Sequence, residues 1–557
     1  MKSIKFMILS LAICSLAWAA PQNPILKAME GELNRSIQNL VMEGQERPYF
    51  LSYRVTDQTY ITVEASLGAV TQSNESRNRR LSVDLRVGSY ELDNSGVKKQ
   101  RWSYDEEEYK YKNMQVPIDD DTIGLKHQLW LATDYGYKKA VEDYAKKTKD
   151  IALNPKDEER PPDFSQEDPE VYIGDEAKIS VDRAEWEERI KRYSALFAEY
   201  EDITISRVQF EARAKTAYFV SSEGSKIQDG DLLYSIEIEA CTRAEDGMPL
   251  RDYRRFYSYD GIWDEERIKT EITEMAKGLI TLKEAEACES YAGPVLIAAP
   301  ASGAFVSAVL APLLKASKKR WKDEEGLQNK VGERVILPSI SVYDDPTINT
   351  YKGLTLVGYY RFDDQGVQAR KVNLIERGVL YNFLMSRSPV KGFDKSNGHS
   401  RDGVKIGNLI LESSTPQSFS QLKSRLITEC KRQGKPYGLL VTSTRLPESR
   451  AGRSVIIHIS GADDGGAGPV LGGLQPVEVY KVYTDGRQEP LRGVEVLAGS
   501  PLATLGKIIA VGNDPRAWST SFGTGSIVAP SILLSELEIR KTSQGMRTLP
   551  ILSPPVE

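Results

Sequence analysis

The chain has 557 residues, of which 40% are apolar and 27% charged, and its formal net charge is −6. This composition is typical of a soluble globular protein, and the length allows more than one hydrophobic core. The excess of acidic residues argues against a nucleic-acid partner, because such a surface repels phosphates.

Residues 1–19 have the pattern of a secretory signal peptide. Lys2 and Lys5 precede an uncharged apolar run over residues 6–16, and Ala17-Trp18-Ala19 favours cleavage after Ala19. Loss of the two lysines takes the formal charge from −6 to −8. We therefore expect an exported protein, either periplasmic or extracellular.

The next part of the chain alternates between helical and strand patterns. Apolar residues at helical spacing predict helices over residues 25–45, 127–147, 184–201 and 264–287. Period-two alternation predicts short strands over residues 49–57, 60–68, 80–92, 203–214, 216–224, 232–244 and 251–260. Residues 148–184 are polar and proline-bearing, which predicts an exposed connection or insertion.

The stretch VLIAAPASGAFVSAVLAPLL, residues 295–314, contains no charged residue. Its length would suit a membrane span, but Pro300 and Pro312 and the many small residues argue against one. We predict a buried strand over 295–299, a turn over 300–303, and a helix from Ala304 that continues into KASKKRW.

The remaining sequence predicts strands and hairpins. The strand patterns cover residues 335–345, 354–366, 371–386, 437–445, 454–466 and 476–487. Arg377-Gly378 and Asp485-Gly486 predict tight turns, and one helix over 418–434 is expected to stop at Gly434.

These patterns predict an α+β protein. Its N-terminal half mixes strands with long helices, and its C-terminal half is mostly antiparallel strands and hairpins. The expected divisions after the signal peptide are an N-terminal region (20–147), the polar connection (148–184), a central α+β region (185–291) and a C-terminal domain (292–557).

Few residues suit metal chemistry. The only histidines are His127, His399 and His458, and neither an H-E-x-x-H nor a C-x-x-C spacing occurs. A zinc site built from His399, His458 and Cys430 stays open as an alternative. After signal cleavage Cys241, Cys288 and Cys430 remain, and we expect buried thiols, with one bridge between two of them as the alternative.

Polar clusters in the second half give weak site candidates. The pairs Asp344-Asp345 and Asp363-Asp364 stand at predicted strand ends, where turn-forming aspartates are common. The loop containing Asn397, His399, Arg401 and Asp402 combines an imidazole, a guanidinium and a carboxylate, so it is a candidate catalytic site. An ordinary polar loop is the favoured interpretation.

The order of segments in the second half resembles the TldD/PmbA family of zinc metallopeptidases. The matching segments, in chain order, are GPVLIAAPASGAFVSAVLAP, GERVILPSISVYDDP, GYYRFDDQGVQARKVNLIERGVLYNFLMS, SNGHSRDG, YKVYTDGRQEPLRGVEV and VGND. In catalytic members the helix after the opening strand carries H-E-x-x-x-H, with two zinc ligands and a general base.

The chain departs from the family at this motif. The motif positions fall at Ala308, Val309 and Leu313, and residues 293–322 contain no His, Glu, Asp or Cys. The third ligand of catalytic members is a late cysteine, and none follows Cys430. The resemblance therefore implies no metal or other cofactor in this chain, with zinc only in a catalytic partner.

Three functions follow from the resemblance and the residues. The chain is expected to be a non-catalytic subunit that assists peptide degradation, in a heterodimer with a TldD-like homologue or as a homodimer. A stand-alone protein that binds peptides along strand edges without hydrolysing them is the alternative. Enzyme activity from the loop around His399 is the third hypothesis.

Overall fold

The structure is a computed structural model that describes residues 23–97, 111–153, 160–316, 318, 327–445, 474–497, 499–520 and 524–542. The predicted signal peptide, the predicted strand at 454–466 and His458 lie outside these residues.

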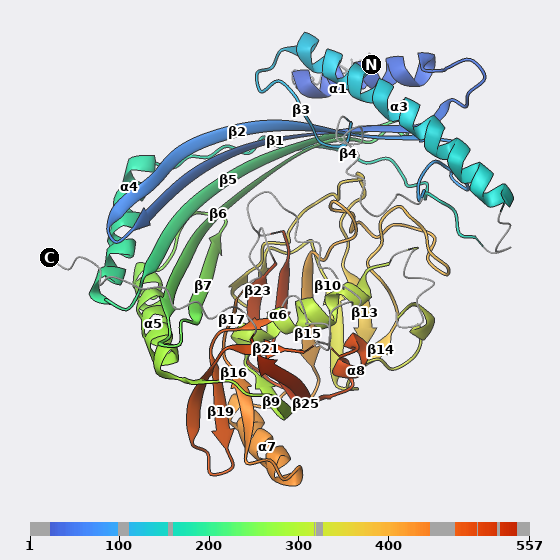
Figure 1. The fold of residues 1–557 in the computed structure, drawn as a ribbon. Coiled ribbons are helices and arrows are strands. Elements are labelled where there is room, and N and C mark those ends of the chain that lie inside the picture. Colours follow the sequence, from blue (N-terminus) through green and yellow to red (C-terminus); the bar gives the residue numbers. More distant parts are fainter. Residues whose placement is uncertain are drawn as a thin grey trace, which may run out of the picture.

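A long curved sheet forms the N-terminal half and arches over the C-terminal half (Figure 1). Its strand order is β3-β2-β1-β5-β6-β4, with β7 paired to β6. The strands are β1 (Pro48–Ser66), β2 (Ala69–Val87), β3 (Met114–Gln115), β4 (Val171–Ile173), β5 (Ile205–Ser221), β6 (Lys226–Arg243) and β7 (Pro249–Ser258). The prediction of short strands was wrong here, because 49–57 with 60–68 form one strand, and 203–214 with 216–224 form another.

Asp57 explains why β1 looks interrupted in the sequence. It lies on the face of β1 that carries buried Val55 and Val63, where alternation would place an apolar residue. Its carboxylate accepts hydrogen bonds from Arg77 (3.0 Å) and Arg79 (2.9 Å) of the neighbouring β2. The paired charge lets the strand continue without a break.

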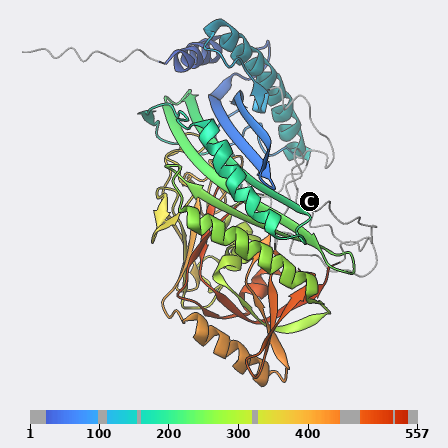
Figure 2. The same cartoon turned by 90° about the vertical axis from the view of Figure 1, so that its left-hand side faces the viewer.

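Four helices cover the convex face of the sheet (Figures 1 and 2). They are α1 (Pro24–Asn39), α3 (Thr122–Leu153), α4 (Arg183–Ala195) and α5 (Glu265–Glu284). Helices α1 and α3 enclose one core cluster that contains Tyr53 and Val55, and α4 and α5 enclose a second that contains Val63 and Phe210. The four helices predicted in this half are confirmed, with shifted ends.

Part of the predicted exposed connection is buried. Asp163, Phe164 and Ser165 are at most 5% exposed. The ring of Phe164 lies between two guanidinium groups, 3.6 Å from that of Arg86 and 3.9 Å from that of Arg387. Exposure was wrongly predicted because these partners lie far away in the sequence.

Two large sheets build most of the described C-terminal half, which also contains two two-stranded sheets, β11 (Thr350–Tyr351) with β12 (Leu354–Thr355) and β17 (Thr444–Arg445) with β18 (Gln475–Pro476). One large sheet has the order β14-β13-β10-β15-β24-β23, and the other has the order β21-β25-β9-β16-β19-β20-β8, with β22 paired to β25. The strands are β8 (Glu286–Ala287), β9 (Tyr291–Ile297), β10 (Ile340–Asp344), β13 (Val372–Glu376), β14 (Val379–Leu380), β15 (Asn408–Ser413), β16 (Tyr437–Val441), β19 (Val479–Tyr483), β20 (Gln488–Arg492), β21 (Val494–Val496), β22 (Ile508–Val511), β23 (Arg516–Ser519), β24 (Ser526–Ala529) and β25 (Ile532–Lys541).

Most strand pairs in this half are antiparallel, and the α+β prediction is confirmed. Helix α6 (Ala299–Val309) belongs to a core cluster shared by both sheets. Helix α7 (Phe419–Arg432) packs on the opposite face of the β9 sheet and confirms the helix predicted there. A short helix, α8 (Pro501–Leu505), contacts α6.

The uncharged stretch differs from its prediction in two ways. Pro300 lies in the first turn of α6 instead of a separate turn, a position where its missing N–H breaks no helical hydrogen bond. The helix ends at Val309 and is followed by a 3₁₀ turn, Ala311–Leu314, instead of continuing through Lys315. None of the helices in the described ranges is long and apolar enough to cross a membrane.

Cys241, Cys288 and Cys430 are buried in the described part of the chain, as predicted.

Candidate functional site

The three positions that the sequence analysis matched to the zinc motif, Ala308, Val309 and Leu313, lie against the hydrophobic core of the C-terminal half. Val309 is fully buried, and Ala308 and Leu313 pack against the same core cluster. Alkyl side chains offer no lone pair and no charge to offset the hydration that a zinc ion loses on binding. These residues do not fit a zinc ion.

Helix α6 is held close to its neighbours by small residues. Gly303 faces Trp518 of β23 so closely that an added Cβ would lie 2.2 Å from the Trp518 Cβ. Ser302 donates a hydrogen bond from Oγ to the carbonyl oxygen of Ala529 on β24 (3.1 Å). The helix therefore serves as a packed structural element.

The candidate loop around His399 does not gather its residues at one point. His399 is completely buried, with Nε2 3.1 Å from Asp344 Oδ1 and Nδ1 3.0 Å from Asn397 Oδ1. Asp344 also accepts hydrogen bonds from the backbone N–H groups of Gly407 and Asn408. This buried network fixes the loop that follows Asn397.

The other two loop residues point elsewhere. Arg401 lines a cavity, whereas the Asp402 side chain is 93% exposed and pairs with Lys405 at 3.3 Å. Cys430, which was one of the three ligands of the alternative zinc site, lies on the buried face of α7 beside Leu422 and Leu426. Within the described ranges, no group of three or more His, Cys, Asp or Glu side chains is arranged to hold a metal ion.

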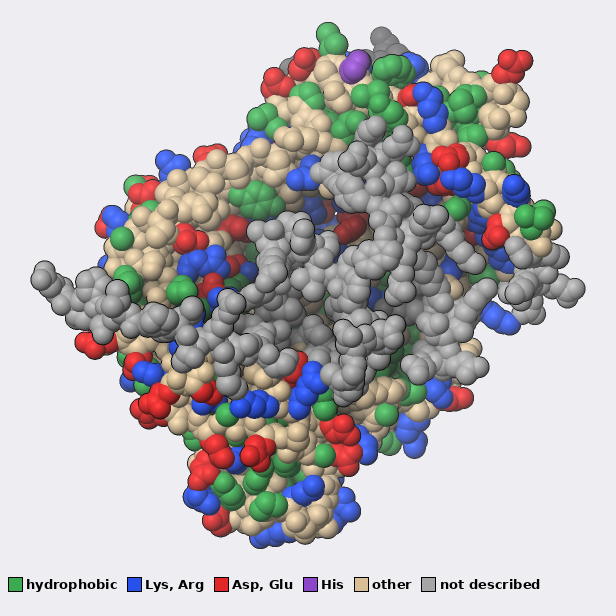
Figure 3. All heavy atoms as spheres, in the orientation of Figure 1, with side chains coloured by type: hydrophobic (Ala, Val, Ile, Leu, Met, Phe, Trp, Pro, Cys, Tyr) green, Lys and Arg blue, Asp and Glu red, His purple; other side chains and the backbone are tan. Residues whose placement is uncertain are grey.

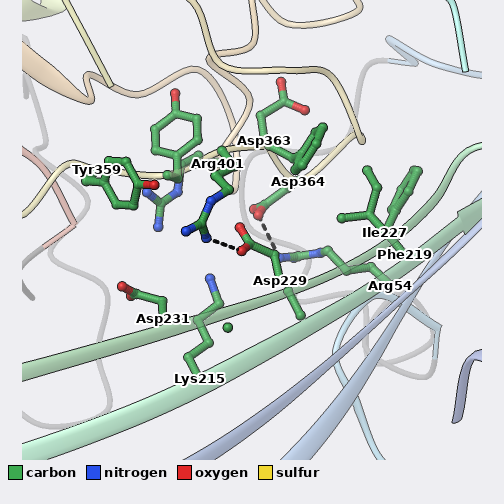
Figure 4. A pocket seen from close by; sticks show the side chains of 15 residues that line it. Arg54, Lys215, Phe219, Ile227, Asp229, Asp231, Tyr359, Asp363, Asp364 and Arg401 are labelled. Atoms are coloured by element: carbon green, nitrogen blue, oxygen red, sulfur yellow. Dashed lines mark hydrogen bonds and ion pairs between the residues drawn. The ribbon is translucent and has the colours of Figure 1, made fainter. Parts of the chain in front are cut away.

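The cavity lined by Arg401 lies between the concave face of the arch and loops of the C-terminal half (Figure 4). Its volume is about 60 Å³. The strands contribute Arg54 from β1, Lys215, Ala217 and Phe219 from β5, and Ile227, Asp229, Gly230 and Asp231 from β6. The C-terminal half contributes Tyr359, Tyr360, Arg361, Phe362, Asp363, Asp364 and Arg401.

The loop and the sheet approach each other closely at one end of the cavity. Gly366, with φ of +75°, faces Phe219, and a Cβ added there would lie 2.3 Å from the Phe219 ring. A glycine is required here both for the contact and for the left-handed backbone. Figure 3 shows charged side chains of both signs in the hollow under the arch.

Ion pairs occupy most of the charged groups that line the cavity. Arg54 Nη1 lies 2.7 Å from Asp364 Oδ1, and Arg361 Nη1 lies 2.5 Å from Asp229 Oδ1. Asp231 pairs with Arg213 at 3.5 Å. Lys215 and Arg401 are different, because neither side chain has a hydrogen-bond or ion-pair partner in the described part of the chain; Arg401 lies over the Tyr360 ring, 4.6 Å from its centroid.

Burial and neighbouring charges shift the pKa values in the cavity. Burial, followed by repulsion from Arg401, lowers the pKa of Lys215 to about 8. Burial raises the pKa of Asp363 to about 6, although three backbone N–H groups donate to its carboxylate. Burial also opposes ionisation of Asp364, but Arg54 and Lys215 hold its pKa below the usual range. At neutral pH the cavity therefore holds two unpaired cations.

Sequence reasoning found only part of this cavity. It selected Arg401 as a site candidate and assigned Asp363 and Asp364 to turns. Asp363 does form a turn, accepting from the backbone N–H groups of Gln365 and Val367. Sequence reasoning missed Arg54 and Lys215. Both lie on the polar side of strands with alternating polarity, but any strand with one solvated face shows the same pattern, so this signal could not distinguish them.

Known proteins resemble this chain in sequence. Residues 290–448 match the PmbA/TldA metallopeptidase C-terminal domain. A metalloprotease of Methanocaldococcus jannaschii is 25% identical over 256 residues, which cover 44% of this chain and 51% of the relative. A metalloprotease of Methanothermobacter thermautotrophicus is 25% identical over 318 residues, 56% of this chain and 63% of the relative. The matches span between about half and two thirds of these curated relatives.

Solved structures share the fold along most of the chain. A putative modulator of a DNA gyrase from Thermotoga maritima superposes with a TM-score of 0.59 at 16% identity, covering 92% of this chain and 99% of that one. TldE from Thermococcus kodakarensis gives a TM-score of 0.59 at 14% identity, with the same coverage. Residues 290–448 are therefore similar to the TldD/PmbA family of metallopeptidase-like proteins, the metalloprotease relatives agree with this similarity, and the shared fold extends along most of the chain.

Proposed function

We propose that this chain is an exported, non-catalytic member of its family that binds peptides and assists their hydrolysis by a zinc-bearing homologue. The main support for this proposal is that Ala308, Val309 and Leu313 are apolar and pack in the hydrophobic core. A chain without ligands at these positions has no means of activating water in the way that catalytic members of the family do. The fold is otherwise retained, which supports a role in binding or assembly.

The location and the partner rest on different observations. Export is supported by the signal-peptide pattern of residues 1–19 and leads to the periplasm or the extracellular space. The partner is proposed as a TldD-like chain that carries H-E-x-x-x-H, in a heterodimer. A homodimer that binds peptides without hydrolysing them is the second candidate, and the cavity with its two unpaired cations favours a binding role in either case.

Metal content and activity test the main proposal. The mature chain is purified alone and after co-expression with a homologue from the same organism that retains the zinc motif. We expect less than about a tenth of an equivalent of zinc in the lone chain, since a competent structural or catalytic site would bind zinc stoichiometrically. Zinc and peptidase activity are expected in the co-purified complex.

A control assigns the activity to the partner. Replacing the motif glutamate of the homologue by glutamine should abolish hydrolysis while leaving the complex intact by native mass spectrometry. Stoichiometric zinc in the lone chain would contradict the proposal. Failure of the two chains to associate would favour the homodimer.

A further inference from the structure

Two cations face the same cavity from opposite sides, and although the carboxylates of Asp364 and Asp231 attract Lys215, neither forms an ion pair with it in the described chain. Lys215 projects from strand β5, and Arg401 projects from the loop fixed by the buried His399–Asp344 contact (Figure 4). Both belong to the described residues, where neither side chain has an ion pair or hydrogen bond. Burying an unpaired charge is unfavourable, so a cavity that keeps two of them is suited to an anion.

The other charged groups do not compete for that anion. Arg54 is paired with Asp364, with Nη1 2.7 Å from Oδ1. Arg361 is paired with Asp229, with Nη1 2.5 Å from Oδ1. Asp231 is turned to Arg213. The four carboxylates of the lining, Asp229, Asp231, Asp363 and Asp364, remain close, however, and they would repel a group with two negative charges more strongly than a group with one.

The volume of the cavity limits the ligand to a small anionic group. A volume of about 60 Å³ accommodates a few non-hydrogen atoms. Apolar surface from Phe219 and Ile227 lies at one side of the cavity, and the two unpaired cations lie away from it (Figure 4). A planar carboxylate can accept from an ammonium and a guanidinium at the same time.

We propose that this cavity receives a carboxylate of a bound peptide between Lys215 and Arg401. The inference rests on the peptide binding proposed above and specifies the chemical group that is recognised. Two sources can supply it, the C-terminal α-carboxylate or an acidic side chain. Lys215 and Arg401 act as binding residues, and no bond is made or broken at this site.

The proposal can be tested with three synthetic pentapeptide libraries. Each library is mixed with the full mature chain, unbound peptides are removed by ultrafiltration, and the retained peptides are identified by mass spectrometry. The first has free C-terminal carboxylates and no Asp or Glu. The second contains the same sequences as C-terminal amides. The third has amidated C-termini and one internal Asp or Glu. The same experiment is repeated with the co-purified complex carrying the glutamine-substituted homologue, which cannot degrade the peptides.

We expect the first or the third library to be retained at least about tenfold better than the second, as for charge-assisted hydrogen bonds to buried groups. The first is retained if the C-terminus is the source, and the third if an acidic side chain is. The preference is expected to disappear in Lys215→Met and in Arg401→Leu. Lys405→Met is the matched control, because it removes a cation from the same loop outside the cavity.

Two failures can be told apart. Equal retention of all three libraries, or an acid preference that survives both cavity substitutions, would overturn the inference and leave peptide binding in place. Retention of none of the libraries by either preparation would overturn the proposed peptide binding and the inference with it. Lys215→Arg, which keeps the charge, should retain the preference and shows whether a loss in Lys215→Met reflects charge rather than altered folding.

Discussion

Lys215 lies in an environment unlike that of an ordinary surface lysine. Its ammonium group is desolvated and faces the guanidinium of Arg401, and both effects disfavour the charged form. An uncompensated charge of this kind lowers stability, so a gain elsewhere is needed to explain it. Binding of an anion supplies such a gain.

The lowered pKa predicts a pH dependence for carboxylate binding. Below about pH 8 Lys215 is protonated in the free protein, and above this pH the protein must take up a proton to bind the anion. The dissociation constant of a retained peptide acid should therefore be flat up to about pH 8 and then rise by up to about tenfold per pH unit. Isothermal titration calorimetry between pH 6.5 and 9.5 measures this.

The substitution Lys215→Arg is the control for that profile. A guanidinium stays protonated throughout this range, so the variant should show no rise above pH 8. The other titratable and charged groups that line this cavity are Arg54, Asp229, Asp231, Tyr359, Tyr360, Arg361, Asp363, Asp364 and Arg401. An identical rise in wild type and variant would show that another group is responsible.

At the scale of elements, helix α6 depends on a close contact with its neighbour β23. The helix packs on β23 through Gly303, where the added Cβ of an alanine would overlap Trp518. Gly303→Ala should lower the free energy of unfolding by about 1–3 kcal/mol, because overpacking forces neighbouring groups apart. Chemical denaturation followed by circular dichroism measures this change.

Gly31 provides a matched comparison within another helix. It lies in α1, and a Cβ added there would meet no atom within 4 Å. Gly31→Ala should raise the free energy of unfolding by about 0.5–1 kcal/mol, since alanine loses less backbone entropy in a helix. A loss of stability in both variants would mean that helix geometry, not contact with Trp518, controls the effect.

Helices were predictable from the sequence to a greater extent than strands. The apolar stripe of α1 is a local signal that predicted this helix, and the helix predicted over 418–434 begins at a local capping box formed by Ser418 and Gln421. The continuity of β1 was not predictable, because Asp57 is neutralised by arginines of another strand. The cavity was found only at Arg401 for the same reason, since its other unpaired cation, Lys215, comes from the other half of the chain.

At the scale of the whole molecule, Arg387 joins the arch to the C-terminal half. Its side chain is 2% exposed and donates from Nη1 to Glu223 (2.7 Å) and from Nε to the carbonyl oxygen of Ser165 (3.0 Å). Removing the cation leaves a largely buried carboxylate unpaired. Arg387→Met should therefore lower the free energy of unfolding by about 3–5 kcal/mol.

An exposed ion pair provides a control for the predicted loss of stability in Arg387→Met. Arg487 pairs with Glu489, with side chains 58% and 39% exposed. Arg487→Met should change the free energy of unfolding by less than about 1 kcal/mol. Equilibrium denaturation in guanidinium chloride compares the two variants, and equal effects would argue against a special role for the buried contact.

The separation of the cavity walls along the chain has a consequence for biosynthesis. Arg54 and Asp364 are 310 residues apart. The strand wall is complete at Asp231 and the loop wall begins 128 residues later at Tyr359, so at about 5–20 residues per second a ribosome needs roughly 6–26 s to begin the second wall after the first. During that interval the concave face of the nascent sheet has no lid. Ligand recognition can thus begin only late in maturation, and a chain truncated before residue 359 would carry only the strand side of the cavity.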